Sequence, residues 1–192
     1  FPLRRDEFML VTSPFGMRQD PINGSKQQMH KGIDIRTKQD DVLATESKGK
    51  VVSVNANANT AGGKSVEVEY ERENGDKVKV SYLHLSSIDV KVGDEVNAGQ
   101  KLGVSGNTGN RTTGEHLHFG VKQISSDGTS RDLDPASYLA EIAQKGNIQI
   151  QAMSNGQDLL AKYKSQDVNA DEKKEDQSIP QTPEDWMKKL LS

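Results

Sequence analysis

The residues of this chain best suited to chemistry are its four histidines, which all fall within three short motifs. The motifs are His30-Lys31-Gly32-Ile33-Asp34, Tyr82-Leu83-His84-Leu85 and His116-Leu117-His118. Imidazoles and a carboxylate that converge from distant parts of a chain are common ligands of a metal ion. We therefore expect a metal centre assembled from separate structural elements.

The His-x-His pair lies in a sequence typical of a β-strand. His116 and His118 should then project from the same face, while Leu117 and Phe119 point to the other. Either both imidazoles bind a metal, or one binds it while the other acts as an acid/base group, and spacing alone does not choose between these. The alternative without chemistry is two exposed strand histidines.

The first motif needs a bend to serve as a ligand pair. Fully extended, positions 30 and 34 would be about 13 Å apart, so Gly32 must bend the backbone between His30 and Asp34. One Asp oxygen and two His nitrogens would leave one tetrahedral position for water, as in catalytic zinc sites. The alternative is that Asp34 only caps a turn. His84 alone would be interpreted as a structural histidine. A functional role for it is favoured only because the other three histidines already indicate a site.

Composition restricts the possible partners and the number of domains. A chain of 192 residues is long enough for one core with appendages. Its net charge of -3, without clusters of basic and aromatic residues, gives no reason to expect nucleic acid as a partner. Cysteine is absent, which excludes disulfides, thiolate zinc ligands and cysteine nucleophiles. No apolar run is long enough for a membrane span.

Alternating apolar residues predict a mainly β fold with an antiparallel sheet. Strands are expected over 51–54, 65–70 and 77–82, with a hairpin turn at Asn74-Gly75. The stretch 90–103 is also β-rich, with glycines at its corners. Biotinyl and lipoyl carrier domains share that pattern, but this chain lacks the Met-Lys pair that would present the cofactor.

The C-terminal part of the chain has a different character. Asp134-Pro135 predicts a helix start and Gly146 its end, and a second helix is expected over 157–164. We divide the chain into a domain at 1–146 and a C-terminal extension at 147–192. Residues 165–181 are almost wholly polar and predict a linker. The last segment, 182–191, predicts an amphipathic helix that docks on the domain or on a protein partner.

Several motifs in a fixed order resemble the lysostaphin and LytM type of peptidoglycan endopeptidase. The resemblance covers roughly residues 11–139. Besides the three histidine motifs, it includes the segments Ser13-Pro14-Phe15-Gly16-Met17-Arg18, Gly106-Asn107-Thr108-Gly109 and Asp134-Pro135. It implies a small antiparallel β-sheet core of the LytM type, barrel- or sandwich-like, with short C-terminal helices.

The resemblance also implies a role for each motif. His30, Asp34 and His118 would bind Zn²⁺, and His84 and His116 would be the catalytic histidines, one a general base and the other steadying charge. Arg18 would bind substrate or support a ligand, and Thr113 would bind substrate. The implied reaction is zinc-assisted hydrolysis of peptide bonds in the stem peptides or cross-links of bacterial peptidoglycan.

Two departures from the family pattern lie at the rim of the expected site. The loop 110–115 is longer than usual, and Gly120 stands where many members carry Glu, so specificity is affected more than activity. A catalytically inactive regulator that activates another wall hydrolase is the alternative function, although such proteins usually lose a ligand and this chain keeps all five positions. Because peptidoglycan lies outside the cytoplasm, we expect an exported protein whose signal peptide is not present in this chain.

Overall fold

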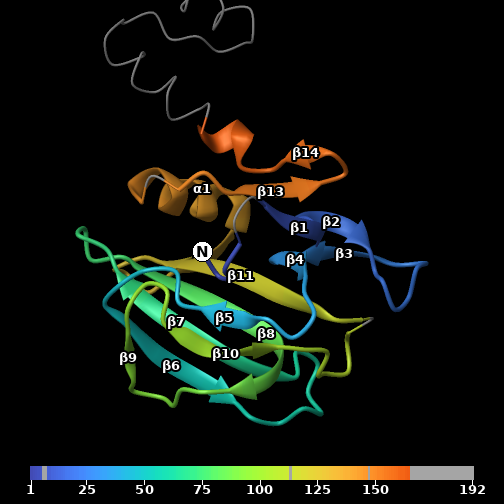
Figure 1. Cartoon of the computed structure of the whole chain (residues 1–192), viewed down its shortest axis with the longest axis horizontal. Helices are drawn as coiled ribbons and strands as arrows, with labels where there is room; N and C mark the ends of the chain where they lie inside the picture. Colours follow the sequence, from blue (N-terminus) through green and yellow to red (C-terminus); the bar gives the residue numbers. More distant parts are fainter. Residues whose placement is uncertain (6–7, 113, 147, 165–192) are drawn as a thin grey trace, which may run out of the picture.

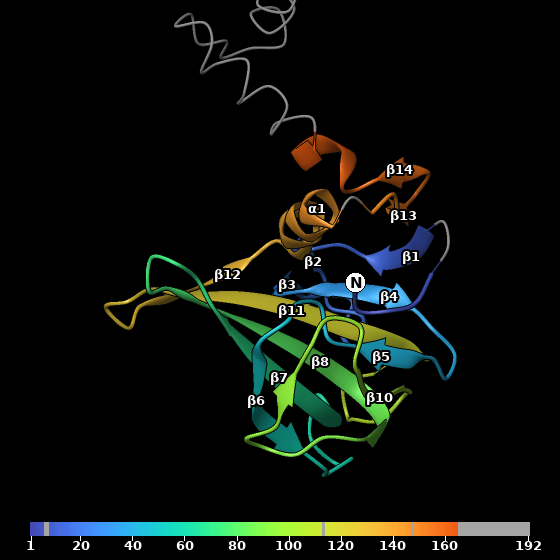
Figure 2. The same cartoon turned by 60° about the vertical axis from the view of Figure 1, so that its left-hand side comes forward.

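The computed structural model describes residues 1–5, 8–112, 114–146 and 148–164. Fourteen strands and one α-helix follow in chain order within these residues (Figures 1 and 2). They are β1 (Phe8–Ser13), β2 (Gly16–Gln19), β3 (Gln27–His30), β4 (Ile33–Arg36), β5 (Asp41–Leu43), β6 (Gly49–Asn55), β7 (Lys64–Glu71), β8 (Lys77–Ile88), β9 (Glu95–Val96), β10 (Lys101–Ser105), β11 (His116–Ile124), β12 (Ser130–Leu133), α1 (Pro135–Lys145), β13 (Gln151–Ser154) and β14 (Gln157–Asp158).

Most strands join one large sheet, whose main path runs β14-β13-β1-β4-β11-β8-β7-β6-β9. The path has two distinct ends in the described residues, so the sheet is open and does not close into a barrel. β2 and β3 form a separate antiparallel pair. The mainly β fold expected from the alternating sequence is confirmed, and all pairings of the main path are antiparallel except that of β1 with β13.

The β7–β8 hairpin is the clearest case of a local signal that fixes structure. Its turn follows Glu71, which pairs with Lys77, and Gly75 adopts a positive φ of 88°. Glycine reaches that region without the steric cost that a Cβ atom imposes. The expected Asn74-Gly75 turn is therefore found, and it sets the register of two long strands beside the central strand β11.

The centre of the sheet consists of β4, β11 and β8, and its two faces differ in chemistry. In β11, Leu117 and Phe119 are fully buried, whereas His116 and His118 are partly exposed on the opposite face. The alternation of a β-strand produces this division. The buried face belongs to a continuous apolar core, and the other face carries the polar side chains described below.

Helix α1 covers the apolar face near β11 (Figure 1). Its N-cap is Asp134, whose side chain accepts a hydrogen bond from the N–H of Ala136, and Pro135 occupies the first turn. Gly146 is the C-cap. Tyr138 and Leu139 are buried against the sheet. The expected helix start and end are therefore confirmed.

The second expected helix is wrong over its first part. Strands β13 and β14 form a hairpin around Asn155 and Gly156, whose φ values are 49° and 78°. An Asn-Gly dipeptide with both residues at positive φ is a common two-residue hairpin turn, and it outweighs the helical spacing of the leucines that follow. Only 161–164 are helical. The linker and helix expected over 165–191 lie outside the described residues.

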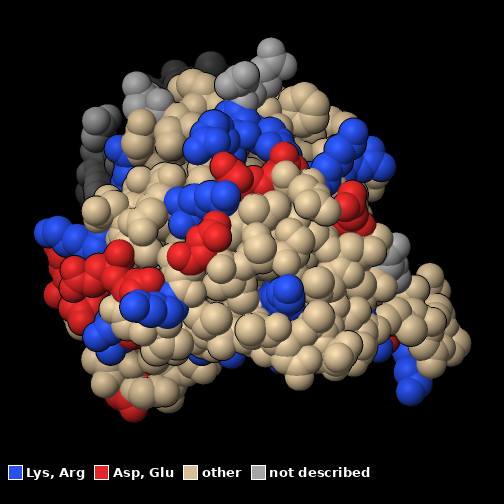
Figure 3. Space-filling model, turned by 60° about the horizontal axis from the view of Figure 1, so that its bottom comes forward, with Lys and Arg blue, Asp and Glu red and all other residues tan. Residues whose placement is uncertain are grey.

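Two surface properties complete the description. On the face shown in Figure 3, Lys and Arg side chains alternate with Asp and Glu around a broad area of other residues. No helix in the described part of the chain is long and apolar enough to cross a membrane.

Candidate metal centre and active site

Three predicted metal ligands meet on the polar face of the sheet. His30 ends β3, Asp34 lies in β4, and His118 in β11 is the direct cross-strand partner of Asp34. Oδ1 of Asp34 is 3.0 Å from Nδ1 of His118 and 3.3 Å from Nε2 of His30. One ligand atom from each residue lies within 4.8 Å of the others. The structure therefore brings the expected cluster together.

Gly32 permits this convergence mainly because it has no side chain. The residue forms the expected bend between β3 and β4. A Cβ atom at Gly32 would lie 2.6 Å from the carbonyl oxygen of Phe119 and 2.7 Å from Nε2 of His118. Since its φ is not positive, space is the requirement that excludes other residues. The sequence argument located the bend correctly but did not recognise the packing.

The Asp34 carboxylate has a different partner on each oxygen. Oδ1 faces the two imidazoles, and Oδ2 accepts a hydrogen bond at 3.1 Å from the Arg18 guanidinium, which also donates to Oγ of Ser13 at 2.6 Å. Burial opposes ionisation of Asp34, but hydrogen bonds from His118 and His30 outweigh it and hold its pKa well below the ordinary value. Asp34 is thus an anionic group whose orientation Arg18 fixes.

The ring orientation of His30 fits metal binding. Its Nδ1 lies 2.9 Å from the carbonyl oxygen of Pro14, and because a carbonyl only accepts, Nδ1 carries the proton. Nε2 points into the cluster, 3.3 Å from Nδ1 of His118 and 3.3 Å from Oδ1 of Asp34. A histidine held by a backbone carbonyl on its far side is the usual arrangement of a metal ligand. The donor set of two imidazoles and one carboxylate fits zinc.

The other two histidines stand beside this cluster as a pair. The ring centroids of His84 and His116 are 4.6 Å apart, and that of His84 is 6.4 Å from His118. His116 precedes His118 by two residues on the same face of β11, as expected. All four histidines line one cavity.

His84 reaches this cavity only because β8 is irregular. Val80 and Tyr82 point into the core, so regular alternation would direct His84 there too. Instead His84 adopts a φ of +66°, and the pairing register of β7 with β8 shifts in this region. Both Leu83 and His84 then line the cavity. A positive φ is uncommon outside glycine and clusters at functional sites.

Each of these two histidines is held through Nδ1. In His84 it donates to the carbonyl oxygen of Thr108 at 2.7 Å, and in His116 it donates to that of Gly114 at 2.7 Å. Nε2 of each ring is therefore left available for other contacts. Burial lowers the pKa of His84 to about 4, so this ring is neutral at pH 7. A neutral imidazole can accept a proton.

The cavity has a volume of about 600 Å³ and extends beyond the histidines. Arg18 lines it, as does Arg111, whose guanidinium donates to both carboxylate oxygens of Asp20 at 2.7 and 2.8 Å. Arg18 is therefore located where either a substrate-binding or a ligand-supporting role is feasible. Thr113 lies outside the described residues.

Sequence reasoning missed several residues that hold the site. Ser13 contacts Arg18, Thr108 holds His84, and the Arg111–Asp20 ion pair joins the loop before β11 to the segment after β2. Ser13 and Thr108 occur in motifs that were recognised, but backbone carbonyl acceptors have no side-chain signature. The Arg111–Asp20 pair joins positions 91 residues apart, and no local pattern indicates it.

Comparison with known proteins identifies the class. Residues 28–135, more than half of the chain, match the model of peptidase family M23. The chain therefore belongs to that family.

Similar proteins include cell-wall peptidases. The chain is 37% identical over 118 residues to lysostaphin of Staphylococcus simulans, covering 62% of this chain and 22% of that protein. It is 36% identical over 120 residues to an uncharacterized metalloprotease of Haemophilus influenzae, covering 62% of this chain and 23% of that protein. A segment of 46 residues, 24% of this chain and 10% of the relative, is 54% identical to the peptidoglycan DD-endopeptidase ShyA of Vibrio cholerae. The matched regions thus span less than a quarter of these relatives.

Solved structures show the same fold. The catalytic domain of lysostaphin from Staphylococcus simulans aligns with a TM-score of 0.53 at 34% identity, covering 67% of this chain and 90% of that domain. LytU aligns with a TM-score of 0.53 at 33% identity, covering 72% and 87%. The expected relationship to lysostaphin- and LytM-type peptidases is confirmed.

Proposed function

We propose that this chain is a zinc-dependent endopeptidase that hydrolyses peptide bonds in the stem peptides or cross-links of peptidoglycan. One observation carries the proposal: the ligand atoms of His30, Asp34 and His118 lie within 4.8 Å of one another, with His84 and His116 beside them in one cavity. Membership of family M23 supports a peptidase. The family relationship alone does not distinguish an active enzyme from an inactive member, whereas a complete set of five side chains favours activity.

His30, Asp34 and His118 would hold the zinc ion. When bound there, zinc would act as a Lewis acid that polarises the scissile carbonyl and acidifies water. Arg18 holds Oδ2 of Asp34, and the carbonyl of Pro14 accepts a hydrogen bond from Nδ1 of His30. These contacts would orient the donor atoms toward the ion.

His84 and His116 would carry the proton chemistry. Both rings leave Nε2 available for other contacts, and their proximity would allow one to accept a proton from water while the other steadies charge that develops on the carbonyl oxygen. The backbone carbonyls behind them fix the orientation of the rings. The proton would then pass to the departing amine.

The names of the relatives indicate the substrate class. ShyA is a peptidoglycan DD-endopeptidase, and ALE-1 of Staphylococcus capitis, 40% identical over 75 residues, is a glycyl-glycine endopeptidase. We infer a peptidoglycan peptide as the substrate here and prefer stem-peptide cross-links to glycine bridges. A cell-wall substrate implies action in the cell envelope after export.

Two measurements on the purified chain test the proposal. Elemental analysis of protein prepared without chelator should find about one zinc per chain. Mass spectrometry of a digest of purified muropeptides should find products cut at a peptide bond, and a chelator should stop their formation. Zinc binding without any cleavage would overturn the enzymatic proposal in favour of an inactive regulator. Failure to bind added zinc would overturn both the proposed zinc site and the enzymatic proposal.

A further inference from the structure

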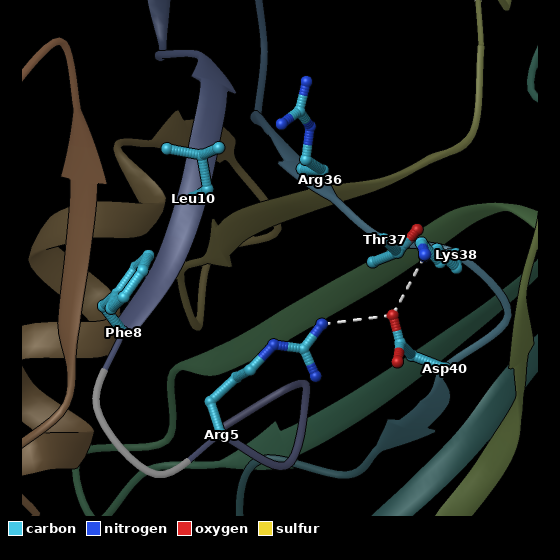
Figure 4. Close-up of a pocket in the computed structure, with 7 residues that line it drawn as sticks. All are labelled: Arg5, Phe8, Leu10, Arg36, Thr37, Lys38 and Asp40. Carbon is cyan, nitrogen blue, oxygen red and sulfur yellow. Dashed lines mark hydrogen bonds and ion pairs between the residues drawn. The ribbon is translucent and has the colours of Figure 1, made fainter.

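A second hollow, of about 630 Å³, lies beside the catalytic cavity at the start of β1 and the end of β4 (Figure 4). We call it the basic hollow. Phe8 and Leu10 of β1 form one side, Arg36 stands at another edge, and Arg5 reaches across toward Asp40 (Figure 4). Its lining comprises Arg5, Phe8, Leu10, Arg36, Thr37, Lys38 and Asp40. The volume is in the range of pockets that bind small organic groups.

The basic hollow continues the face that carries the histidines. Arg36 follows the ligand Asp34 by two residues in β4, and its direct partner in β11 is His116. Leu10 precedes Thr12, which lines the catalytic cavity, by two residues in β1. Residues two apart in a strand, and direct cross-strand partners, share a face. A peptide that passes His116 along this face therefore reaches Arg36 next.

The hollow has a positive charge that its own acid does not neutralise. It contains three cations, Arg5, Arg36 and Lys38, and one anion, Asp40. Asp40 is already engaged, since Oδ2 accepts from Arg5 at 3.1 Å and from the backbone N–H of Lys38 at 3.0 Å. Within the described residues, the side chains of Arg36 and Lys38 form no ion pair. Two cationic groups are thus available to an anion.

The remaining lining is apolar and partly unsatisfied. Phe8 is 47% exposed although it is large and hydrophobic, and Leu10 beside it is half-buried. Thr37 also lines the hollow, and its hydroxyl is buried without a hydrogen-bond partner in the described part of the chain. A ligand with an aliphatic portion and a carboxylate would match both parts of this surface.

We propose that the basic hollow is a substrate subsite that binds a free carboxylate of the peptide through Arg36 and Lys38, with an aliphatic group against Phe8 and Leu10. This proposal rests on the proposed function and deepens it by naming the substrate class. Arg presents a planar fork of donors suited to a carboxylate, and Lys adds a point charge. The subsite makes the enzyme selective for acidic stem peptides over neutral glycine-rich peptides.

The test compares two peptides on the full zinc-loaded chain. One is a dimer of the stem peptide L-Ala–γ-D-Glu–L-Lys–D-Ala, joined by a D-Ala–L-Lys cross-link and with its carboxylates free, and the other is the same dimer with its carboxylates converted to carboxamides. Calorimetric titration measures binding and mass spectrometry measures cleavage in parallel. The variants are Arg36→Gln and Lys38→Gln, and the matched controls are Arg131→Gln and Lys50→Gln, which remove the same charges outside the hollow.

We expect the free acid to bind at least about fivefold more tightly than the amide, as charge-assisted hydrogen bonds predict. The preference should fall in Arg36→Gln and Lys38→Gln, persist in both controls, and shrink as salt increases. Equal affinity of the two peptides for the wild type, or a preference that survives in both hollow variants, would overturn the subsite. A preference in binding without cleavage of either peptide would leave the subsite standing and count against the proposed function. Cleavage of both peptides at equal rates, with equal affinities, would count against the subsite and leave the proposed function standing.

Discussion

Gly32 and His118 lie so close that a Cβ atom at position 32 would be 2.7 Å from Nε2 of His118. It would also be 2.6 Å from the carbonyl oxygen of Phe119, which belongs to the central strand and has little freedom to move. The first histidine motif and the last are therefore interlocked. Gly32 has no side chain that could bind a metal, yet its small size is required for the proposed ligands His30 and His118 to lie close together.

Gly32→Ala should disrupt the metal centre. The added methyl group must displace His118 or separate β4 from β11, and overpacking of this kind costs about 1–3 kcal/mol. We expect zinc affinity to fall at least about tenfold, measured with a competing chelator, and the melting temperature to decrease. Gly24→Ala is the matched control, since a Cβ there has no atom within 4 Å. Unchanged zinc affinity in Gly32→Ala would contradict the packing argument.

Substitution of the two β11 histidines should separate two roles. His118→Ala removes a ligand atom, so zinc content and hydrolysis should be lost together. His116→Ala should retain zinc, because its Nε2 is 3.7 Å from Asp34 and its ring is held by Gly114, outside the ligand cluster. Its activity should fall by about 100-fold or more, as expected for a general acid/base group. Equal zinc loss in the two variants would show that the assignment within the His-x-His motif is wrong.

Arg18→Gln should weaken zinc binding through Asp34. The substitution removes the guanidinium that holds Oδ2, and loss of such a supporting contact typically costs about 10- to 100-fold in metal affinity. Competition with a chelator gives the affinity, and KM for a soluble muropeptide gives the effect on substrate. A raised KM with unchanged zinc affinity would instead favour the substrate-binding role.

The Asp20–Arg111 pair should make stability depend on pH in the acid range. Hydrogen bonds from the N–H of Ile22 and from Arg111 lower the pKa of Asp20 from 3.8 to about 2. The pKa of Asp20 is depressed in the folded state. The stability that ionised Asp20 contributes is therefore complete above the ordinary pKa and is lost as pH falls from about 4 to about 2. Asp20→Asn should therefore show a smaller drop in melting temperature across this range than the wild type. An equal drop in melting temperature for the wild type and Asp20→Asn across this pH range would contradict the prediction.

Two truncations test the division of the chain at 146. A chain that ends at Gly146 lacks β13, which pairs with β1, and lacks Ala152 and Leu160, which are fully buried. We expect the free energy of unfolding to decrease by about 2–5 kcal/mol or more, as for removal of a large core side chain. A chain that ends at Ser165 should retain zinc content and hydrolysis of soluble muropeptides. A large loss of that activity on removing 166–192 would show that the tail supports the site, whereas a loss only on intact wall would indicate targeting.

The sequence predicted which histidines the structure places with Asp34 in one cavity, because the motifs consist of recognisable side chains. Period two placed His116 and His118 on one face, and Gly32 marked the bend before Asp34. Long-range packing and backbone geometry could not be predicted from the sequence. The positive φ of His84 breaks the period that the strand otherwise follows, and it coincides with a shift of register between β7 and β8. Likewise, the Asn155-Gly156 dipeptide indicates a hairpin turn, and this turn outweighs the helical spacing of the apolar residues after it.

Because Asp34 pairs with His118 across two strands, the proposed zinc ion would also favour the correct register of β4 and β11. In the unfolded chain these two residues are 84 positions apart, so no local fluctuation assembles the ligands. A slip of one residue between β4 and β11 would turn both histidines of β11 toward the core and bring Leu117 to the surface. Only the correct register would chelate the proposed ion, and a bound ion would lower the free energy of that register alone. The metal that would serve catalysis thereby also selects, among the pairings open to these strands, the one in which catalysis can occur.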